Sequence, residues 1–494
     1  MDHARLYLPL LIGGLAIVAS VGAARLASRA GLPVLLAYLG VGLILGEDVL
    51  GVDFGDERLA HDLGNAALAI ILVEGGLATR WRSLRPVIAP AMLLATIGVV
   101  VSVGVTAAGA VLLIGTDWRL ALLLGAIVAS TDAAAVFSVL RSLPLPGRLA
   151  GLLEAESGFN DAPTVILVSV LSIGTLHWTT PLEVIYQLAI GAAIGLFTGG
   201  AGAWVLRRIS LPSSGLYPIA AFGAGIVAFG AAGFAHGSGF LAAYLAGILL
   251  GNSSLPHRRA VQSFAEGLGW VAQIGLFVML GLLVTPHELP AVILPALLVG
   301  GVLLLAARPL SIAVSLLPWR LPWREQIFLS WAGLRGAVPI VLATIPVVNG
   351  VPGSERLFNI VFVLVVAFTL IQGPTLPWLA RRLGLSSPDP IQDMQVESAP
   401  LDALAADLLY LSVTPGSRLH GCEVYELRLP APAAVTLVVR DGDAFVPSRD
   451  TRLRLGDELL VVTGAANREE VEARIRSVAE SGALARWYAR RRKS

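Results

Sequence analysis

Long apolar stretches recur along most of this 494-residue chain and restrict its fold more than any other feature. A stretch of about 17–25 such residues lets a helix cross the hydrocarbon layer of a bilayer. The first stretch lacks a signal-peptide cleavage pattern, so we expect it to stay as a helix. The sequence predicts thirteen spans, the ninth of them short: residues 6–24, 31–46, 62–79, 86–114, 119–140, 151–176, 184–206, 214–235, 238–251, 267–284, 289–315, 325–347 and 357–380.

The composition agrees with a membrane setting. Hydrophobic residues make up 56% of the chain and charged residues only 14%, whereas a soluble domain carries about 25% charged residues. A formal net charge of +1 gives no reason to expect a nucleic-acid partner. The single cysteine, Cys422, excludes an internal disulfide and a multi-cysteine metal site. The expected partner is therefore the lipid bilayer.

Arginine residues gather in every second loop between the predicted spans, from Arg25 and Arg29 to Arg381 and Arg382. The alternate loops are short or acidic, as in residues 47–57. Because basic residues accumulate on the cytoplasmic side, this alternation predicts a multi-pass protein of the plasma or inner membrane. With an odd number of spans, the N-terminus lies outside and everything after Arg382 lies in the cytoplasm.

A soluble domain is predicted after the last span. Apolar runs there shorten to strand length, and turn signals separate them, as in Arg-Asp-Gly at residues 440–442. The predicted organisation is a transmembrane domain at residues 1–385, a linker at 386–399, a cytoplasmic α+β domain at 400–480 and a basic tail at 481–494. The fold class is thus an all-α polytopic membrane protein with a small α+β domain.

Acidic residues inside two apolar segments are the best clue to function. Asp132 lies in the fifth predicted span, and Glu156 and Asp161 lie in the sixth. A charged side chain at membrane depth costs at least about 2.5–3.5 kcal/mol, so intramembrane acids usually line an ion or proton path. These segments therefore predict an ion transporter.

Ser157 and Asp161 are four residues apart, so on a helix they share a face and can offer oxygen ligands to one small cation. Glu156 and Asn160 form the neighbouring stripe. Oxygen ligands suit a hard alkali cation, and no His or Cys set for a transition metal accompanies them. A carboxylate in a low-dielectric site also binds protons readily, so we expect cation and proton to compete for Asp161.

Ser130, Thr131 and Asp132 stand together in the middle of an apolar run. Such a sequence can interrupt a helix, and interrupted helices expose free backbone groups where transporters bind ions. The alternative is that the hydroxyls bond back to their own helix while Asp132 caps a turn.

Arg335, flanked by Gly333 and Gly336, places a fixed positive charge in the twelfth predicted span. It needs a buried counter-ion, and Glu156 is the expected partner because Asp132 and Asp161 must stay free for exchange. We expect this pair to support the site rather than to bind the ion.

Four segments resemble signature segments of bacterial monovalent cation:proton antiporters: GAIVASTDAAAVFSVL, LLEAESGFNDAPTVIL, GFLAAYLAGILLGN and WAGLRGAVPIVLATIP. The Asn160-Asp161 pair is similar to that of the electroneutral branch. The resemblance implies exchange of one proton for one Na+ or K+, two inverted repeats, crossed and partly unwound helices, and a homodimer. The protein would then be a transporter and not an enzyme, with no catalytic residues.

The same resemblance assigns roles by matching position. Asp161 would be the main carrier of cation and proton, with Asp132 and Ser157 close to the ion. Thr131 would contribute through its backbone at the helix break. Asn160 would support the crossing, and Glu156 with Arg335 would form the buried ion pair of the family.

The C-terminal domain resembles the TrkA C-terminal domain, also called RCK-C, through PGSRLHGCEVYELRLP and VVRDGDAFVPSRDTRLRLGDELLVVTG. That domain usually regulates potassium transport, which favours K+ over Na+. No Gly-x-Gly-x-x-Gly follows a strand there, so we expect no NAD or ATP regulation and no cofactor. The resemblance leaves open a cyclic dinucleotide as a small-molecule regulator.

Three alternatives remain. One is a Na+/H+ antiporter with the same mechanism. An RCK-regulated potassium channel would need filter loops of the Thr-Val-Gly-Tyr-Gly type, which the sequence lacks. An intramembrane aspartyl protease would need a Tyr-Asp and Gly-x-Gly-Asp pattern, whereas this chain has Ser-Thr-Asp and Phe-Asn-Asp.

Overall fold

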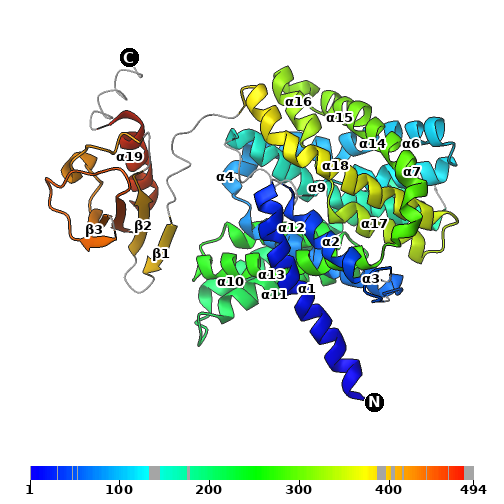
Figure 1. The fold of residues 1–494 in the computed structure, drawn as a ribbon, viewed down its shortest axis with the longest axis horizontal. Helices are drawn as coiled ribbons and strands as arrows, with labels where there is room; N and C mark the ends of the chain where they lie inside the picture. The colour runs from blue at the N-terminus through cyan, green and yellow to red at the C-terminus, as the bar shows by residue number, and fades with distance from the viewer. Residues whose placement is uncertain are drawn as a thin grey trace. The chain divides into compact units, whose positions relative to one another are not determined.

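Two units of different architecture make up the chain, one helical and one built on a β-sheet (Figure 1). The first comprises residues 1–386 and the second residues 387–494. The computed structural model describes the following residues: 2–30, 32–46, 48–52, 54–132, 145–174, 179–385, 397–401, 406–413, 417–440, 442–464 and 467–482.

Apolar helices form the described part of the first unit. Seven helical segments are long and apolar enough to cross a membrane: Leu10–Ala27, Trp81–Ile114, Thr180–Arg208, Leu216–Phe234, Arg258–Leu282, Pro286–Ser315 and Ser354–Arg382. Four apolar helices are shorter: Val34–Leu45, Trp118–Ala129, Gly239–Gly251 and Ala337–Val348. The predicted total of thirteen spans and the inverted repeats stay predictions.

The first half of this unit runs from α1 to α9. Its described elements are α1 (Asp2–Ala30), α2 (Val34–Leu45), α3 (Glu57–Ala78), α4 (Trp81–Leu84), η1 (Arg85–Val87), α5 (Ile88–Leu93), η2 (Leu94–Gly98), α6 (Val99–Ile114), α7 (Trp118–Ala129) and α9 (Gly147–Ile173). Side-chain caps mark two of the helix starts, because Asp56 accepts the Leu59 amide at 3.0 Å and Asp117 accepts the Arg119 amide at 2.9 Å.

The second half contains α10 (Thr180–Arg208), α11 (Leu216–Phe234), α12 (Gly239–Gly251), α13 (Arg258–Leu282), η3 (Pro286–Val292), α14 (Ile293–Val302), η4 (Leu303–Ala307), α15 (Arg308–Ser315), η5 (Leu317–Trp319), α16 (Trp323–Trp331), α17 (Ala337–Val348) and α18 (Ser354–Arg382). Helices α7, α9, α17 and α18 pack around one another and hold the candidate site. Helix α12 packs against α3 and α10 and closes one side of it.

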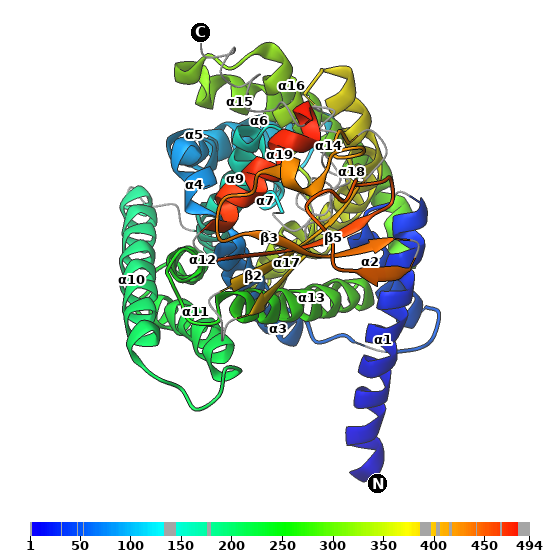
Figure 2. The ribbon, with the colours of Figure 1, turned by 90° about the vertical axis from the view of Figure 1, so that its left-hand side faces the viewer.

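Outer helices carry apolar side chains on their exposed faces. Figure 2 shows α1 and α10 at opposite edges of the helical unit. Leu11 and Val18 of α1 and Phe197 of α10 are 60%, 70% and 75% exposed. Such faces suit lipid rather than water, in agreement with the predicted membrane setting.

Small residues allow the inner helices to approach closely. At Gly195 of α10 an added Cβ would lie 2.6 Å from the Ala242 carbonyl oxygen of α12. At Gly76 of α3 an added Cβ would lie 2.5 Å from the Tyr244 carbonyl oxygen, also of α12. Glycine at such positions lets backbones meet, as is common between membrane helices. These contacts fix α12, and with it Tyr244, beside α3.

An antiparallel sheet forms the core of the second unit. Its strands are β1 (Glu397–Leu401), β2 (Ala406–Ser412), β3 (Ala434–Arg440), β4 (Asp443–Phe445) and β5 (Glu458–Gly464), in the order β1-β2-β5-β3-β4. The 3₁₀ turn η7 (Val424–Leu427) precedes β3, and α19 (Arg468–Ser481) follows β5. Val471 and Ile475 of α19 join the core formed with Leu409 and Val461 of the sheet. The predicted small α+β domain is therefore present.

Candidate functional site

Helix α7 ends in the middle of the predicted fifth span. Its last residue is Ala129, and Ser130 follows with φ −64° and ψ 139°, which is extended backbone. A second break separates α16 from α17, because residues 332–336 are not helical. The interruption predicted at residues 130–132 is thus present. Residues 133–140, the remainder of that predicted span, lie outside the described residues.

The two breaks cross and bond to each other. The Asp132 amide donates to the Leu334 carbonyl at 3.1 Å, and the Ala337 amide donates to Oδ2 of Asp132 at 2.9 Å. The Arg335 guanidinium donates through Nη1 to the carbonyls of Ala129 at 2.8 Å and Ser130 at 2.6 Å. The carbonyl groups freed at the end of α7 therefore find a donor inside the protein, as membrane depth requires.

Because Gly336 has no side chain, the Asp132 carboxylate fits against its backbone. A Cβ at this position would lie 1.7 Å from Oδ2 of Asp132. The carboxylate consequently sits directly against the backbone at the start of α17, where the first amide groups of the helix lack intrahelical partners.

Helix α9 supplies the second carboxylate and its polar neighbours. Ser130 donates its hydroxyl to Oδ1 of Asp161 at 2.6 Å. Thr131 Oγ1 lies 3.0 Å from Ser157 Oγ and accepts a 2.7 Å hydrogen bond from Asn160 Nδ2. All of these side chains are at most 5% exposed. The residues predicted to surround the ion, Asp161, Asp132, Ser157 and Thr131, therefore lie together at the crossing.

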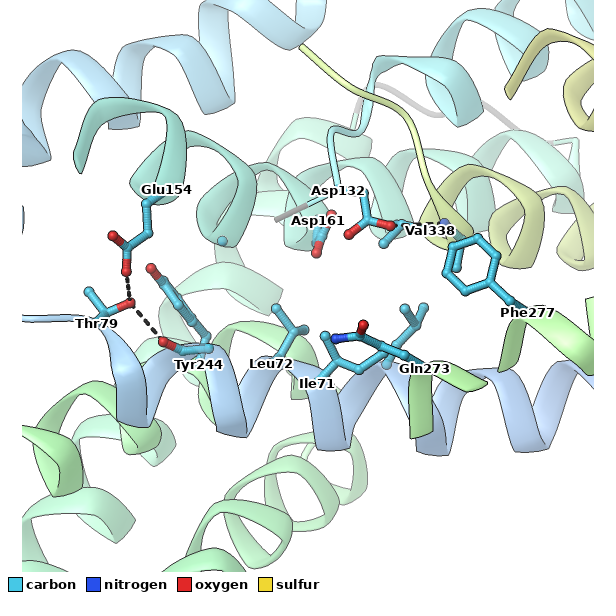
Figure 3. A pocket seen from close by; sticks show the side chains of 14 residues that line it. Ile71, Leu72, Thr79, Asp132, Glu154, Asp161, Tyr244, Gln273, Phe277 and Val338 are labelled. Carbon is cyan, nitrogen blue, oxygen red and sulfur yellow. Dashed lines mark hydrogen bonds between the residues drawn. The ribbon is translucent and has the colours of Figure 1, made fainter. Parts of the chain in front are cut away.

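A small buried cavity adjoins the two carboxylates. Asp132 and Asp161 line it together with apolar residues that include Phe277 and Leu72. The cavity has a volume of about 20 Å³. That volume holds an occupant about as large as one water molecule. In Figure 3 the carboxylates of Asp132 and Asp161 lie next to each other at one wall. Oxygen atoms at this wall suit an alkali cation.

Glu156 pairs with Arg308, which corrects the expected pair with Arg335. Arg308 of α15 donates to both carboxylate oxygens of Glu156, at 3.2 Å from Nη2 to Oε2 and through a second bond from Nη1 to Oε1. Glu156 lies about 100° around α9 from Ser157, since each helical residue turns by that angle. It therefore faces α15, while Arg335 remains bound to the end of α7.

Sequence reasoning missed three contributors to this region. The sequence predicts Ser130 only as part of a helix break, although it binds Asp161 directly. Arg308 is marked in the sequence only as an isolated arginine inside the apolar stretch 289–315. Tyr244 lines the cavity from α12, and only its position within GFLAAYLAGILLGN marked it.

Known proteins resemble this chain over most of its length. The family model described as "Sodium/hydrogen exchanger, transmembrane" matches residues 15–382, and the TrkA-C domain model matches residues 408–476. A K(+)/H(+) antiporter NhaP of Alkalimonas amylolytica is 37% identical over 424 residues, which cover 83% of this chain and 73% of that protein. A K(+)/H(+) antiporter NhaP2 of Shewanella oneidensis is 37% identical over 431 residues, covering 85% of this chain and 75% of that protein.

A solved structure shares the fold over most of the chain. The sodium proton antiporter MjNhaP1 from Methanocaldococcus jannaschii superposes with a TM-score of 0.68 at 22% identity, covering 76% of this chain and 99% of that one. Since the family model spans most of the chain and the relatives exceed 30% identity over most of their length, the chain belongs to the transmembrane sodium/hydrogen exchanger family and carries a TrkA-C domain.

Proposed function

We propose that this protein exchanges a monovalent cation for a proton across the membrane by alternating access. The observation that carries the proposal is that Asp132 and Asp161 line one small buried cavity where two interrupted helices cross. Asp161 is in no ion pair within the described part of the chain, so its charge can be neutralised in turn by a cation and by a proton. Competition for one carboxylate couples the two flows and makes the exchange electroneutral.

The cation would be held by Asp161, Asp132, Ser157 and Thr131. Asp161 and Ser157 lie on α9, and Asp132 and the backbone of Thr131 lie just beyond the end of α7. A relative movement of these two segments would open the site to either side. Asn160 fixes Thr131 through its 2.7 Å hydrogen bond. Arg335 holds the end of α7 in place, and Glu156 with Arg308 ties α9 to α15.

K+ is the favoured cation. The two relatives are both named K(+)/H(+) antiporters. The chain also carries a TrkA-C domain, and domains of this family usually regulate potassium transport. Na+ is the second candidate, because the protein with the matching fold is named a sodium proton antiporter. We place the protein in the inner membrane as a homodimer of thirteen-span subunits with inverted repeats, with the N-terminus outside and the C-terminus in the cytoplasm.

The C-terminal domain would regulate the exchanger from the cytoplasm, with a cyclic dinucleotide as the candidate ligand. Deleting residues 400–494 should change the response to regulatory conditions and leave basal exchange in place. A truncated protein that inserts stably but transports nothing would contradict this role.

The deciding experiment measures proton flux in proteoliposomes that contain a pH-sensitive dye, with K+ or Na+ added outside. We expect K+-dependent proton flux that does not depend on an imposed membrane potential and that Asp161→Asn abolishes. Size-exclusion profiles of the variant should match those of the parent, because asparagine keeps the size of the side chain. Coupled exchange retained in Asp161→Asn would refute the mechanism, and a response to Na+ alone would reassign the cation.

A further inference from the structure

The cavity beside Asp161 reaches a further carboxylate, that of Glu154. Glu154, Gly158 and Asp161 follow one another on α9 at spacings of four and three residues, so they share one helix face. In the view of Figure 3 the ring of Tyr244 lies between Glu154 and the two aspartates. The cavity is therefore lined by carboxylates on both sides of a phenol.

Glu154 is only partly compensated by its surroundings. Thr79 Oγ1 lies 2.6 Å from Glu154 Oε1 and 2.7 Å from the Gly75 carbonyl oxygen. A hydroxyl has a single hydrogen to donate, so Glu154 shares this donor with a backbone group. Glu154 is half-buried, and among the described residues no basic side chain lies in ion-pair contact with it; Arg80 interacts with it only from a longer distance. A carboxylate in that condition within a membrane protein usually has a function.

Tyr244 adds a second hydroxyl to this region. Its side chain is 2% exposed, and its Oη interacts with the neighbouring Thr79 hydroxyl but forms no hydrogen bond of regular geometry with any residue that the structure describes. Gly158 makes room for it, since a Cβ there would lie 2.3 Å from Cζ and 2.7 Å from Oη of Tyr244. Buried hydroxyls nearly always have hydrogen-bond partners, so an oxygen without a regular one, set against the face that joins Glu154 to Asp161, points to a ligand.

We propose that Glu154, Tyr244 and Thr79 form a second, transient binding station for the transported cation, which we call the Glu154 station. This inference rests on the proposed exchange function. Its carboxylate and two hydroxyl oxygens are the donor set that a hard alkali cation takes. An ion held there keeps part of its coordination shell before it reaches Asp161, whose side chain lines the same cavity.

The station lies on the predicted cytoplasmic side of Asp161. Arg80 follows Thr79 directly, and Arg148 precedes Glu154 by six residues on α9. Both arginines are exposed and belong to the basic loops assigned to the cytoplasm. Loss of the station should therefore affect cation entry from the cytoplasm more than entry from outside.

Exchange measured from each face tests this asymmetry. Everted and right-side-out membrane vesicles present the cytoplasmic and the outer face, respectively, to added K+. In Glu154→Gln the half-saturating K+ concentration at the cytoplasmic face should rise about fivefold, which corresponds to ~1 kcal/mol, while the value at the outer face stays unchanged. Tyr244→Phe should shift it in the same direction, and Glu154→Asp should restore part of the affinity. Glu183→Gln, at an exposed glutamate of α10, is the matched control and should behave like the parent.

A binding measurement separates this inference from the exchange function. In purified full-length Asp161→Asn, K+ should still raise the thermal unfolding midpoint relative to equal concentrations of N-methylglucamine chloride. The increase should disappear in Asp161→Asn with Glu154→Gln. If the parent exchanges K+ but Glu154→Gln matches it at both faces, the station is refuted. If the parent shows no cation-dependent flux, the proposed function fails. The Glu154 station is then tested only by whether K+ raises the thermal unfolding midpoint of Asp161→Asn and whether Glu154→Gln removes that increase.

Discussion

Ser130 donates its hydroxyl to Oδ1 of Asp161 at 2.6 Å, from the first residue beyond the end of α7. The bond joins the interrupted helix to the carboxylate that is proposed to carry the ion. Any movement that shifts α7 against α9 must lengthen or break it. Ser130 therefore links the Asp161 carboxylate directly to the helix break.

Removing this hydroxyl should weaken cation binding. Hydrogen bonds to charged groups contribute about 1.5–3 kcal/mol, so Ser130→Ala should raise the half-saturating K+ concentration by about tenfold or more. The quantity to measure is K+-dependent proton flux in proteoliposomes over a range of K+ concentrations. Ser172→Ala is the matched control, because Ser172 is a buried serine on α9 that donates only to the Val168 carbonyl of its own helix. Equal K+ affinity in both variants would show that Ser130 does not orient Asp161.

The ion pair between Glu156 and Arg308 should stabilise the folded protein. Both side chains are at most 4% exposed. Removing one partner of a buried pair leaves an uncompensated charge and costs about 3–5 kcal/mol. Arg308→Met should therefore lower the thermal midpoint of the detergent-solubilised protein strongly, and adding Glu156→Gln should recover much of the loss.

A second double-mutant cycle distinguishes Arg308 from Arg335. Glu156→Gln and Arg335→Met should be coupled less strongly than the pair with Arg308, because Arg335 donates its hydrogen bonds to the carbonyls of Ala129 and Ser130 and interacts with Glu156 only from a longer distance. A larger coupling in this cycle than in the one with Arg308 would restore the pair that the sequence predicts.

Gly336 should tolerate no side chain. The Cβ of Gly336→Ala would lie 1.7 Å from Oδ2 of Asp132, so the carboxylate would have to move and lose the 2.9 Å bond from the Ala337 amide. We expect the exchange rate to fall by about tenfold or more, since misplacing a functional group by roughly 1 Å has effects of this size. Gly104→Ala in α6, where no atom lies within 4 Å of the added Cβ, should leave exchange unchanged. Parental rates in Gly336→Ala would mean that the position of Asp132 does not limit transport.

The sequence predicted the site better than it predicted the electrostatic partners around it. Ser157 and Asp161 could be placed together because helical periodicity alone puts residues four apart on one face. The break at residues 130–132 followed from three polar residues in an apolar run. The partner of Glu156 could not be predicted, because it depends on which helix packs against that face of α9. Arg308 and Arg335 are equally isolated in the sequence, and only tertiary packing distinguishes them.

Close contacts between helices also could not be predicted from the sequence. The contact of Gly76 with the backbone at Tyr244 places a phenol in the cavity, yet each segment by itself contains only an unremarkable glycine or tyrosine. In the second unit the apolar runs were sufficient to predict strands, because β2 and β5 bury alternate residues in one small core and β3 adds the buried Val438 to it. The segment after Ser417 forms the 3₁₀ turn η7 without a long strand, since Glu423 and Glu426 cap that turn reciprocally.

The stability of the TrkA-C domain should depend on pH through Asp457. Burial by itself would raise the pKa of Asp457, but hydrogen bonds from Arg440 at 2.8 and 2.7 Å and from the Arg454 amide at 2.7 Å outweigh it and lower the pKa. A carboxyl group with a lowered pKa in the folded state contributes stability above its unfolded pKa of about 3.9. This contribution disappears as the pH falls through the lower folded value.

Hydrogen exchange of the full-length protein can measure this dependence. Asp457→Asn should reduce the protection of the β5 amides, residues 458–464, at pH 7, and the difference from the parent should shrink as the pH falls below the unfolded pKa of about 3.9. Comparing parent and variant at the same pH removes the intrinsic pH dependence of exchange. Asp450→Asn, at an exposed aspartate in the preceding loop, should leave protection unchanged. A difference between Asp457→Asn and the parent that persists undiminished in acid would show that asparagine perturbs packing and that the charge of Asp457 contributes little.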